Sequence, residues 1–163
     1  MISDSAQHKS AGFLPDAAKA TRGLSTEQLV ALERLGMLYA RIALGAAFLS
    51  AVADRFGLWG KYGGWGNFAT FTVYTGQVNS FMPKFIIPFL AWTATTAETS
   101  CGILLILGLW LRWVALASAI LLFLFGTAMT ISFGAKSPLD YSVFSASAAA
   151  ALLSFHAFIQ RGK

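Results

Sequence analysis

Four long apolar segments constrain the fold of this chain more than any other feature. They cover residues 35–52, 85–111, 113–133 and 141–158, and each contains at least 18 residues. At ~1.5 Å of rise per residue, a helix of this length approaches the ~30 Å thickness of the hydrocarbon core of a bilayer. The sequence therefore predicts an all-α integral membrane protein, a bundle of four transmembrane helices at about 35–54, 85–111, 113–133 and 139–158.

The charge content supports this class and argues against nucleic-acid binding. Only 12% of the 163 residues are charged, whereas a soluble domain averages roughly 25%. The net charge is +5, but the basic residues are scattered and form no basic cluster, so we expect no nucleic-acid partner. With one cysteine and two histidines in the chain, we also predict no metal site.

The segments outside the apolar stretches differ in character. Residues 1–24 are polar and small, and we predict a flexible tail there, followed by the membrane domain over 25–163. Ser25–Gln28 has the pattern of a capping box, which predicts that a helix starts there. A tight hairpin is expected around Arg112. The loop over 54–84 is long and aromatic-rich, and residues 67–78 within it could form a short interfacial helix.

The distribution of Lys and Arg predicts an orientation in the membrane. If the N-terminus is cytoplasmic, seven basic residues lie on the inner side and four on the outer side. Because cytoplasmic loops carry an excess of Lys and Arg, this ratio favours both termini in the cytoplasm. The aromatic loop would then lie on the outer side of a multi-pass protein that contacts the lipid bilayer.

Glu98 is the first candidate for chemistry, since it lies in the second apolar segment. A charged carboxylate at the centre of a transmembrane helix costs ~2.5–3.5 kcal/mol on the insertion scale. Thr95 and Gly102 share its helix face, so we expect Glu98 to point into the bundle. It could bind a ligand or carry a proton, pair with an arginine to fix helix packing, or be protonated.

Arg41 is the expected partner of Glu98, because it is the one charged residue of the first apolar segment. The two residues differ in depth by ~10 Å, counted at ~1.5 Å per residue, which long side chains could largely span. Arg41 could equally extend to the inner headgroups. Glu98 and Arg41 are our candidate catalytic residues.

A second group of candidates lies at the outer end of the first segment and in the aromatic loop. Asp54 and Arg55 close the first segment, where they would anchor the helix at the interface or form part of a substrate site roofed by the loop. Polar loop residues would complete that site, namely Asn67, Tyr74, Gln77 and Asn79.

Several stretches together resemble the DoxX family of small four-helix membrane proteins. They are RIALGAAFLSAVADRFG (41–57), NFATFTVYTGQVNSFMP (67–83), AETSCGILLILGLWLR (97–112) and SPLDYSVFSASAAAALL (137–153). The marks typical of the family match Arg41, Gly45, Arg55, Glu98, Gly102, Gly108 and Arg112. The resemblance implies a four-helix bundle in the inner membrane of a bacterium, and it implies a link to quinone-dependent oxidation.

Three functions remain open from the sequence. The first is a subunit of a quinone-linked oxidoreductase that acts on a small reductant such as thiosulfate, with a quinone as cofactor and a second protein subunit as partner. The second is a protein that binds or transports a small lipophilic molecule. The third is a non-catalytic assembly subunit, in which Arg and Glu fix the register of the helices.

Overall fold

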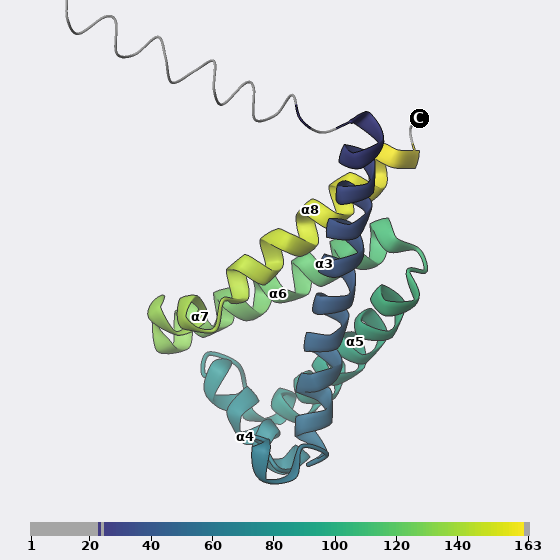
Figure 1. The fold of residues 1–163 in the computed structure, drawn as a ribbon. Helices are drawn as coiled ribbons and strands as arrows, with labels where there is room; N and C mark the ends of the chain where they lie inside the picture. The colour runs from purple at the N-terminus through teal and green to yellow at the C-terminus, as the bar shows by residue number, and fades with distance from the viewer. Residues whose placement is uncertain (1–22, 24, 162–163) are drawn as a thin grey trace, which may run out of the picture. The chain divides into compact units, whose positions relative to one another are not determined.

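The computed structural model describes Gly23 and residues 25–161. Six α-helices and two short 3-10 helices make up this part of the chain (Figure 1). The α-helices are α3 (Thr26–Arg55), α4 (Phe68–Val78), α5 (Ile87–Leu107), α6 (Leu111–Phe133), α7 (Lys136–Asp140) and α8 (Val143–Arg161), and the 3-10 helices are η1 (Gly60–Tyr62) and η2 (Lys84–Ile86). The predicted polar tail lies outside the described residues, apart from Gly23.

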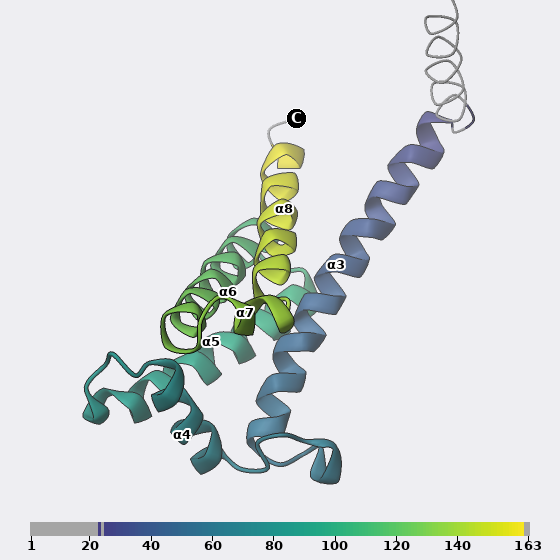
Figure 2. The ribbon, with the colours of Figure 1, turned by 90° about the vertical axis from the view of Figure 1, so that its left-hand side faces the viewer.

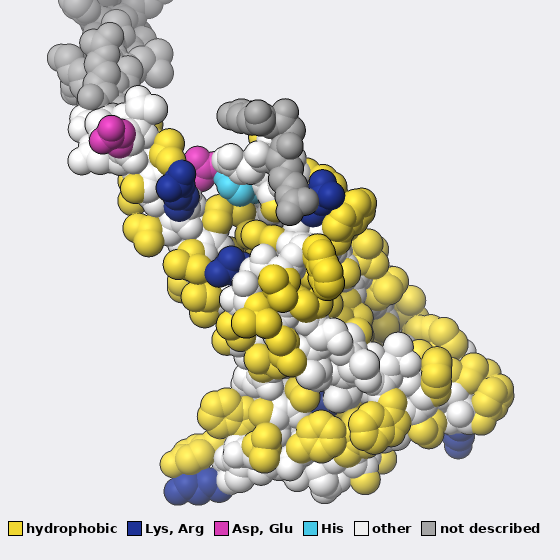
Figure 3. All heavy atoms as spheres, turned by 90° about the vertical axis from the view of Figure 1, so that its right-hand side faces the viewer, with side chains coloured by type: hydrophobic (Ala, Val, Ile, Leu, Met, Phe, Trp, Pro, Cys, Tyr) yellow, Lys and Arg dark blue, Asp and Glu magenta, His cyan; other side chains and the backbone are white. Residues whose placement is uncertain are grey.

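The predicted fold class is confirmed. Four helices are long and apolar enough to cross a membrane, and they are Thr26–Arg55, Lys84–Leu107, Leu111–Phe133 and Val143–Gln160. Large hydrophobic side chains on these helices are exposed, among them Phe123, Leu124 and Leu152, and hydrophobic side chains cover much of the surface in Figure 3. Such a surface requires lipid around it, so the protein is a multi-pass membrane protein.

The chain divides into two units, residues 1–37 and residues 38–163. In the first unit, the predicted capping box is present at the start of α3. The Gln28 backbone N–H donates to Ser25 Oγ at 3.2 Å, and the Ser25 N–H donates to Gln28 Oε1 at 2.8 Å. These bonds satisfy backbone groups that the first helical turn would otherwise leave unpaired.

In the second unit, α6 and α8 lie side by side (Figures 1 and 2). Small residues permit this contact, and two serine hydroxyls hold it. Ser147 donates to the Ala119 carbonyl and Ser154 to the Arg112 carbonyl, both at 2.8 Å. Ala150 and Leu153, at 0% and 1% exposed, fill the space between these bonds, as expected where small side chains let helices pack closely in a membrane.

The turn between α5 and α6 lies at Gly108–Trp110, a few residues before the expected position at Arg112, which is in the first turn of α6. Gly108 has a φ of 71°, a left-handed conformation that glycine adopts without steric cost. Its N–H bonds to the carbonyls of Leu104 and Leu105, and the Leu109 N–H bonds to Leu104. This glycine C-cap ends α5 and fixes the turn.

Helices α3 and α5 are in contact at two glycines, Gly45 and Gly102. A Cβ added to Gly45 would lie 2.9 Å from the Gly102 carbonyl oxygen, and one added to Gly102 would lie 3.1 Å from the Gly45 oxygen. The two backbones therefore touch at this crossing, and no larger residue fits without a shift. The crossing sets which residues of α3 can reach α5.

The loop between α3 and α5 contains the short helix that the sequence suggested, α4. Asn67 caps its start, because Asn67 Oδ1 accepts the Thr70 N–H at 2.9 Å. Aromatic rings pack on and beside α4, with ring centroids 4.3 Å apart for Phe68 and Trp92 and 4.4 Å apart for Trp65 and Tyr74. This aromatic cluster covers the end of α3.

Candidate functional site

The centre of the site is Arg55, in the last turn of α3. A cation is favoured there because the C-terminal end of a helix carries partial negative charge. The side chain is nonetheless buried, at 5% exposed. Since α3 ends at the level of Thr95, eight residues and ~12 Å into α5 from Ile87, Arg55 meets the middle of α5.

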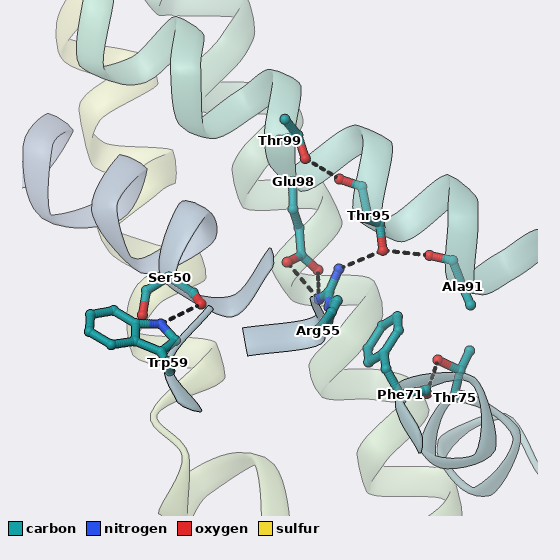
Figure 4. Close-up of polar contacts among 9 residues, drawn as sticks. All are labelled: Ser50, Arg55, Trp59, Phe71, Thr75, Ala91, Thr95, Glu98 and Thr99. Carbon is teal, nitrogen blue, oxygen red and sulfur yellow. Dashed lines mark hydrogen bonds and ion pairs between the residues drawn. The ribbon is translucent and has the colours of Figure 1, made fainter. Parts of the chain in front are cut away.

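Arg55 forms an ion pair with Glu98. Its Nη2 donates to both carboxylate oxygens of Glu98 at 2.7 Å, and its Nη1 donates to Thr95 Oγ1 at 2.9 Å (Figure 4). Glu98 and Thr95 are 2% and 4% exposed. The Thr95 hydroxyl also donates to the Ala91 carbonyl at 2.8 Å. Each charge in this buried cluster therefore has an opposite charge beside it, as burial requires.

Helix α4 closes the cluster from the other side. The Arg55 Cζ lies 3.8 Å from the centroid of the Phe71 ring, a cation–π contact that strengthens when water is excluded. Phe71 is 7% exposed, as is Thr75 one turn later, and the Thr75 hydroxyl donates to the Phe71 carbonyl at 2.9 Å. Figure 4 shows the Phe71 ring beside the guanidinium, below Thr95.

One donor in this cluster has no partner. Arg55 Nε is buried and makes no hydrogen bond within the described part of the chain. An unpaired buried donor costs roughly 1–3 kcal/mol, more when it is charged. The Nε–H of Arg55 is therefore a donor that the described residues leave unsatisfied.

A sequence model of the DoxX family matches residues 36–133, about three fifths of the chain. The protein belongs to the DoxX family. The match includes α3 from residue 36 onward and all of α4, α5 and α6, so it covers every residue of the cluster around Arg55. Searches of curated proteins and of solved structures found no match.

In this DoxX-family protein, the arginine beside Glu98 is Arg55 rather than Arg41, the expected partner. The guanidinium of Arg41 instead lies against Gly108, where an added Cβ would overlap it. Gly108 is ten residues, ~15 Å, beyond Glu98 along α5. Of the two alternatives left open for Arg41, the pair with Glu98 is not formed, because the glycine crossing places Arg41 at the end of α5 and not at its middle.

Asp54 lies next to Arg55 in sequence but belongs to a different environment. Its Oδ2 accepts the backbone N–H groups of Gly64 and Trp65 at 3.0 and 3.2 Å. These bonds fasten the loop to the end of α3. Asp54 also lines an open hollow of about 470 Å³ beside α3, together with Ala47, Ser50, Ala51, Trp59, Tyr62 and Trp65.

The polar loop residues that were predicted to complete a site with Asp54 do not line the hollow beside it. Asn79 Nδ2 donates to the Thr75 carbonyl at 2.9 Å, so it caps the end of α4. Gln77 is exposed. Tyr74 packs against Trp65 and Phe133, and burial, with Tyr141 nearby, raises the pKa of its hydroxyl. Tyr74 therefore stays neutral near pH 7.

Thr95 and Phe71 contribute to the cluster and were not among the candidates from sequence. Thr95 precedes Glu98 by three residues on the same helix face, which is a detectable pattern. Phe71 is harder to find, because it is one of 14 phenylalanines and nothing local indicates that it covers an arginine. Within the described residues, no group of three or more His, Cys, Asp and Glu could hold a metal ion.

Proposed function

We propose that this DoxX-family protein is the quinone-binding membrane subunit of an oxidoreductase that acts on a small reductant such as thiosulfate. One observation carries the proposal. Arg55 Nε is a buried donor without a partner among the described residues, and it belongs to a guanidinium that contacts both the Glu98 carboxylate and the face of Phe71. This combination suits a flat lipophilic molecule with a carbonyl oxygen.

Each residue of the cluster fits one requirement of such a ligand. Arg55 Nε would donate to the carbonyl oxygen, and the Phe71 ring would cover the apolar body of the ligand. Glu98 would exchange a proton with the oxygen atom, because a carboxylate within a low-dielectric site is suited to proton transfer. A quinone supplies the electron chemistry, since it takes up two electrons and two protons on reduction.

A second subunit would take the electrons from the reductant. The chain has one cysteine, too few for an iron–sulfur cluster, which is normally held by four cysteines. In this proposal, the chain contributes the quinone site in the membrane, and a soluble or membrane partner contributes the electron carrier. We place the complex in the inner membrane of a bacterium, with both termini of this chain cytoplasmic.

A second candidate function is binding or transport of a small lipophilic molecule without turnover. The observation that favours it is that both oxygens of Glu98 already accept hydrogen bonds from Arg55. A carboxylate held in this way stabilises the site but does not need to transfer a proton. The same bonds would suit a non-catalytic assembly subunit.

The test compares quinone reduction by thiosulfate in membranes that contain the wild type or Glu98→Gln at matched expression, with candidate partner subunits added. The matched control is Thr127→Val, because among the described residues the Thr127 hydroxyl bonds only to the carbonyl of Phe123 on its own helix. We expect activity in the wild type and the control, and at least a ~100-fold loss in Glu98→Gln, as for removal of an acid–base group.

Two other results would separate the candidates. Activity that survives Glu98→Gln would keep the enzyme but remove Glu98 from its chemistry. Absence of activity above that of empty membranes would contradict the oxidoreductase proposal. In that case, extraction of the purified protein identifies the second candidate if a lipophile is bound in stoichiometric amount and is lost in Arg55→Met.

A further inference from the structure

The hollow beside α3 has two walls of different chemistry. Its first wall is one face of α3, formed by residues at helical spacing, namely Ala47, Ser50, Ala51 and Asp54. Its second wall is the loop, with the aromatic residues Trp59, Tyr62 and Trp65. The Trp59 indole N–H donates to the Ser50 carbonyl at 3.1 Å and so fixes one ring against the helix (Figure 4).

The hollow is separate from the Arg55 cluster. Neighbouring residues on an α-helix point ~100° apart, so Asp54 and Arg55 face different sides of α3. None of the residues that line the hollow belongs to the cluster of Arg55, Glu98, Thr95 and Phe71. The volume of about 470 Å³ lies within the ~300–1,000 Å³ typical of small-molecule sites.

The charge of Asp54 is only partly compensated. Its Oδ2 accepts two backbone N–H groups, but its Oδ1 is buried and has no hydrogen-bond partner among the described residues. The adjacent cation cannot neutralise it, because the Arg55 guanidinium pairs with Glu98. Asp54 Oδ1 lies against Gly63, and the Asp54 side chain brings its negative charge to the wall of a hollow that also contains three aromatic rings.

The carboxylate and the aromatic rings of the hollow together indicate what kind of ligand would bind there. Aromatic faces and a carboxylate both attract cations, and quaternary ammonium groups are recognised by such aromatic cages. A Ca²⁺ ion would need about six to eight oxygen ligands, whereas this hollow offers one carboxylate. At the rim, the Tyr62 ring already makes a cation–π contact, since Lys61 Nζ lies 5.0 Å from its centroid.

We propose that the hollow binds the methylated ammonium group of an organic cation, with Trp59, Tyr62 and Trp65 around the cation and Asp54 as its counter-charge. The group could be part of a free amine such as choline or of a lipid headgroup. The site does not depend on the quinone function, because it shares no residue with the Arg55 cluster.

The first experiment measures choline binding to the full chain in nanodiscs made of phosphatidylglycerol, by equilibrium dialysis with labelled choline. The control ligand is 3,3-dimethylbutan-1-ol, which has the shape of choline without its charge. We expect saturable binding of choline, and at least ~10-fold weaker binding of the neutral alcohol, because the cation–π and Coulomb attractions require the charge.

Two variants test the proposed residues. Asp54→Asn keeps an oxygen for the loop N–H groups and is expected to weaken choline binding about 10-fold. Tyr62→Leu, at an 81% exposed position where folding is not at risk, is expected to weaken it about two- to fivefold. The matched controls are Asp140→Asn and Tyr39→Leu, at exposed positions outside the hollow, which should leave binding unchanged.

Nanodiscs of phosphatidylcholine distinguish the two sources of the ammonium group. If a lipid headgroup is the occupant, phosphatidylcholine discs should abolish binding of free choline in the wild type. If a free amine is the occupant, the binding should be the same in both kinds of disc. The proposal is overturned if choline shows no saturable binding in phosphatidylglycerol, or if neither Asp54→Asn nor Tyr62→Leu weakens it.

Discussion

Two arginines of the same helix, Arg41 and Arg55, have opposite surroundings. They are 14 residues apart, which is close to four helical turns, so both lie on the side of α3 that meets α5. Arg55 is buried and bonded to Glu98 and Thr95. Arg41 is half-buried, its Nε has no hydrogen-bond partner among the described residues, and its guanidinium lies against Gly108.

The difference shows what each position of α5 offers to a cation. At its middle, α5 supplies a carboxylate and a hydroxyl, so a guanidinium can be fully buried there. At its end, α5 supplies backbone carbonyls with partial negative charge, which favour a cation but do not require one. We therefore expect Arg55 to contribute to both stability and function, and Arg41 to contribute a small amount to stability.

The largest effect is expected when the buried ion pair is broken. Arg55→Met leaves the Glu98 carboxylate buried without its counter-charge, which should lower the free energy of unfolding by ~3–5 kcal/mol. The double variant Arg55→Met/Glu98→Leu removes both charges and should recover most of that loss. Unfolding in mixed micelles, followed by far-ultraviolet circular dichroism, measures both differences.

The exposed ion pair between Lys136 and Asp140 provides the matched control. Their side chains are 84% and 58% exposed, and an exposed pair contributes only ~0–1 kcal/mol. Lys136→Met should therefore change the free energy of unfolding by less than ~1 kcal/mol. An equal loss for Arg55→Met and Lys136→Met would mean that burial does not strengthen the Arg55–Glu98 interaction.

An intermediate effect is expected at the glycine crossing that aligns both arginines with α5. Gly45→Ala places a Cβ 2.9 Å from the Gly102 carbonyl oxygen, and backbone cannot move aside as a side chain can. The helices must separate, at a cost of ~1–3 kcal/mol in the free energy of unfolding. Thermal unfolding in detergent, compared with wild type, provides the measurement.

Gly76→Ala is the control for this substitution. A Cβ at Gly76 would meet Ile87 at an ordinary contact distance of 3.5 Å, and alanine in a helix is favoured over glycine by ~0.5–1 kcal/mol. We expect Gly76→Ala to be neutral or stabilising. If Gly45→Ala were equally harmless, the crossing would not set the spacing between α3 and α5.

The sequence was sufficient to predict the fold but not the partner of Glu98. The four apolar segments, the capping box at Ser25 and the helix in the aromatic loop could be predicted because each depends on local pattern and length. Glu98 was also correctly expected to lie in a buried interhelical position beside Gly102. The sequence placed Arg55 at the outer surface as an interfacial anchor or as part of a separate site, so it was not considered as the partner of Glu98, with which it bonds.

Two sets of contacts explain why Arg55, and not Arg41, reaches Glu98. The crossing at Gly45 and Gly102 fixes the offset between α3 and α5, and it brings the end of α3 to the level of Thr95. The aromatic cluster around α4 then covers this end, so Arg55 is shielded from water. Both are contacts between residues far apart in sequence, which a pattern along one segment cannot reveal.

The smallest effect is expected for Arg41. Arg41→Met keeps the length and much of the apolar contact of the side chain, and it removes a cation from the C-terminal end of α5. The loss should be ~0.3–1 kcal/mol in the free energy of unfolding, the usual value for a charge at a helix terminus. The measurement is the same micelle titration that is used for Arg55→Met, and raised salt should reduce the difference between Arg41→Met and wild type because such interactions are screened. A loss as large as that of Arg55→Met would show that Arg41 has a charged partner. The two arginines would then contribute equally to the free energy of unfolding and would differ only in their position along α5.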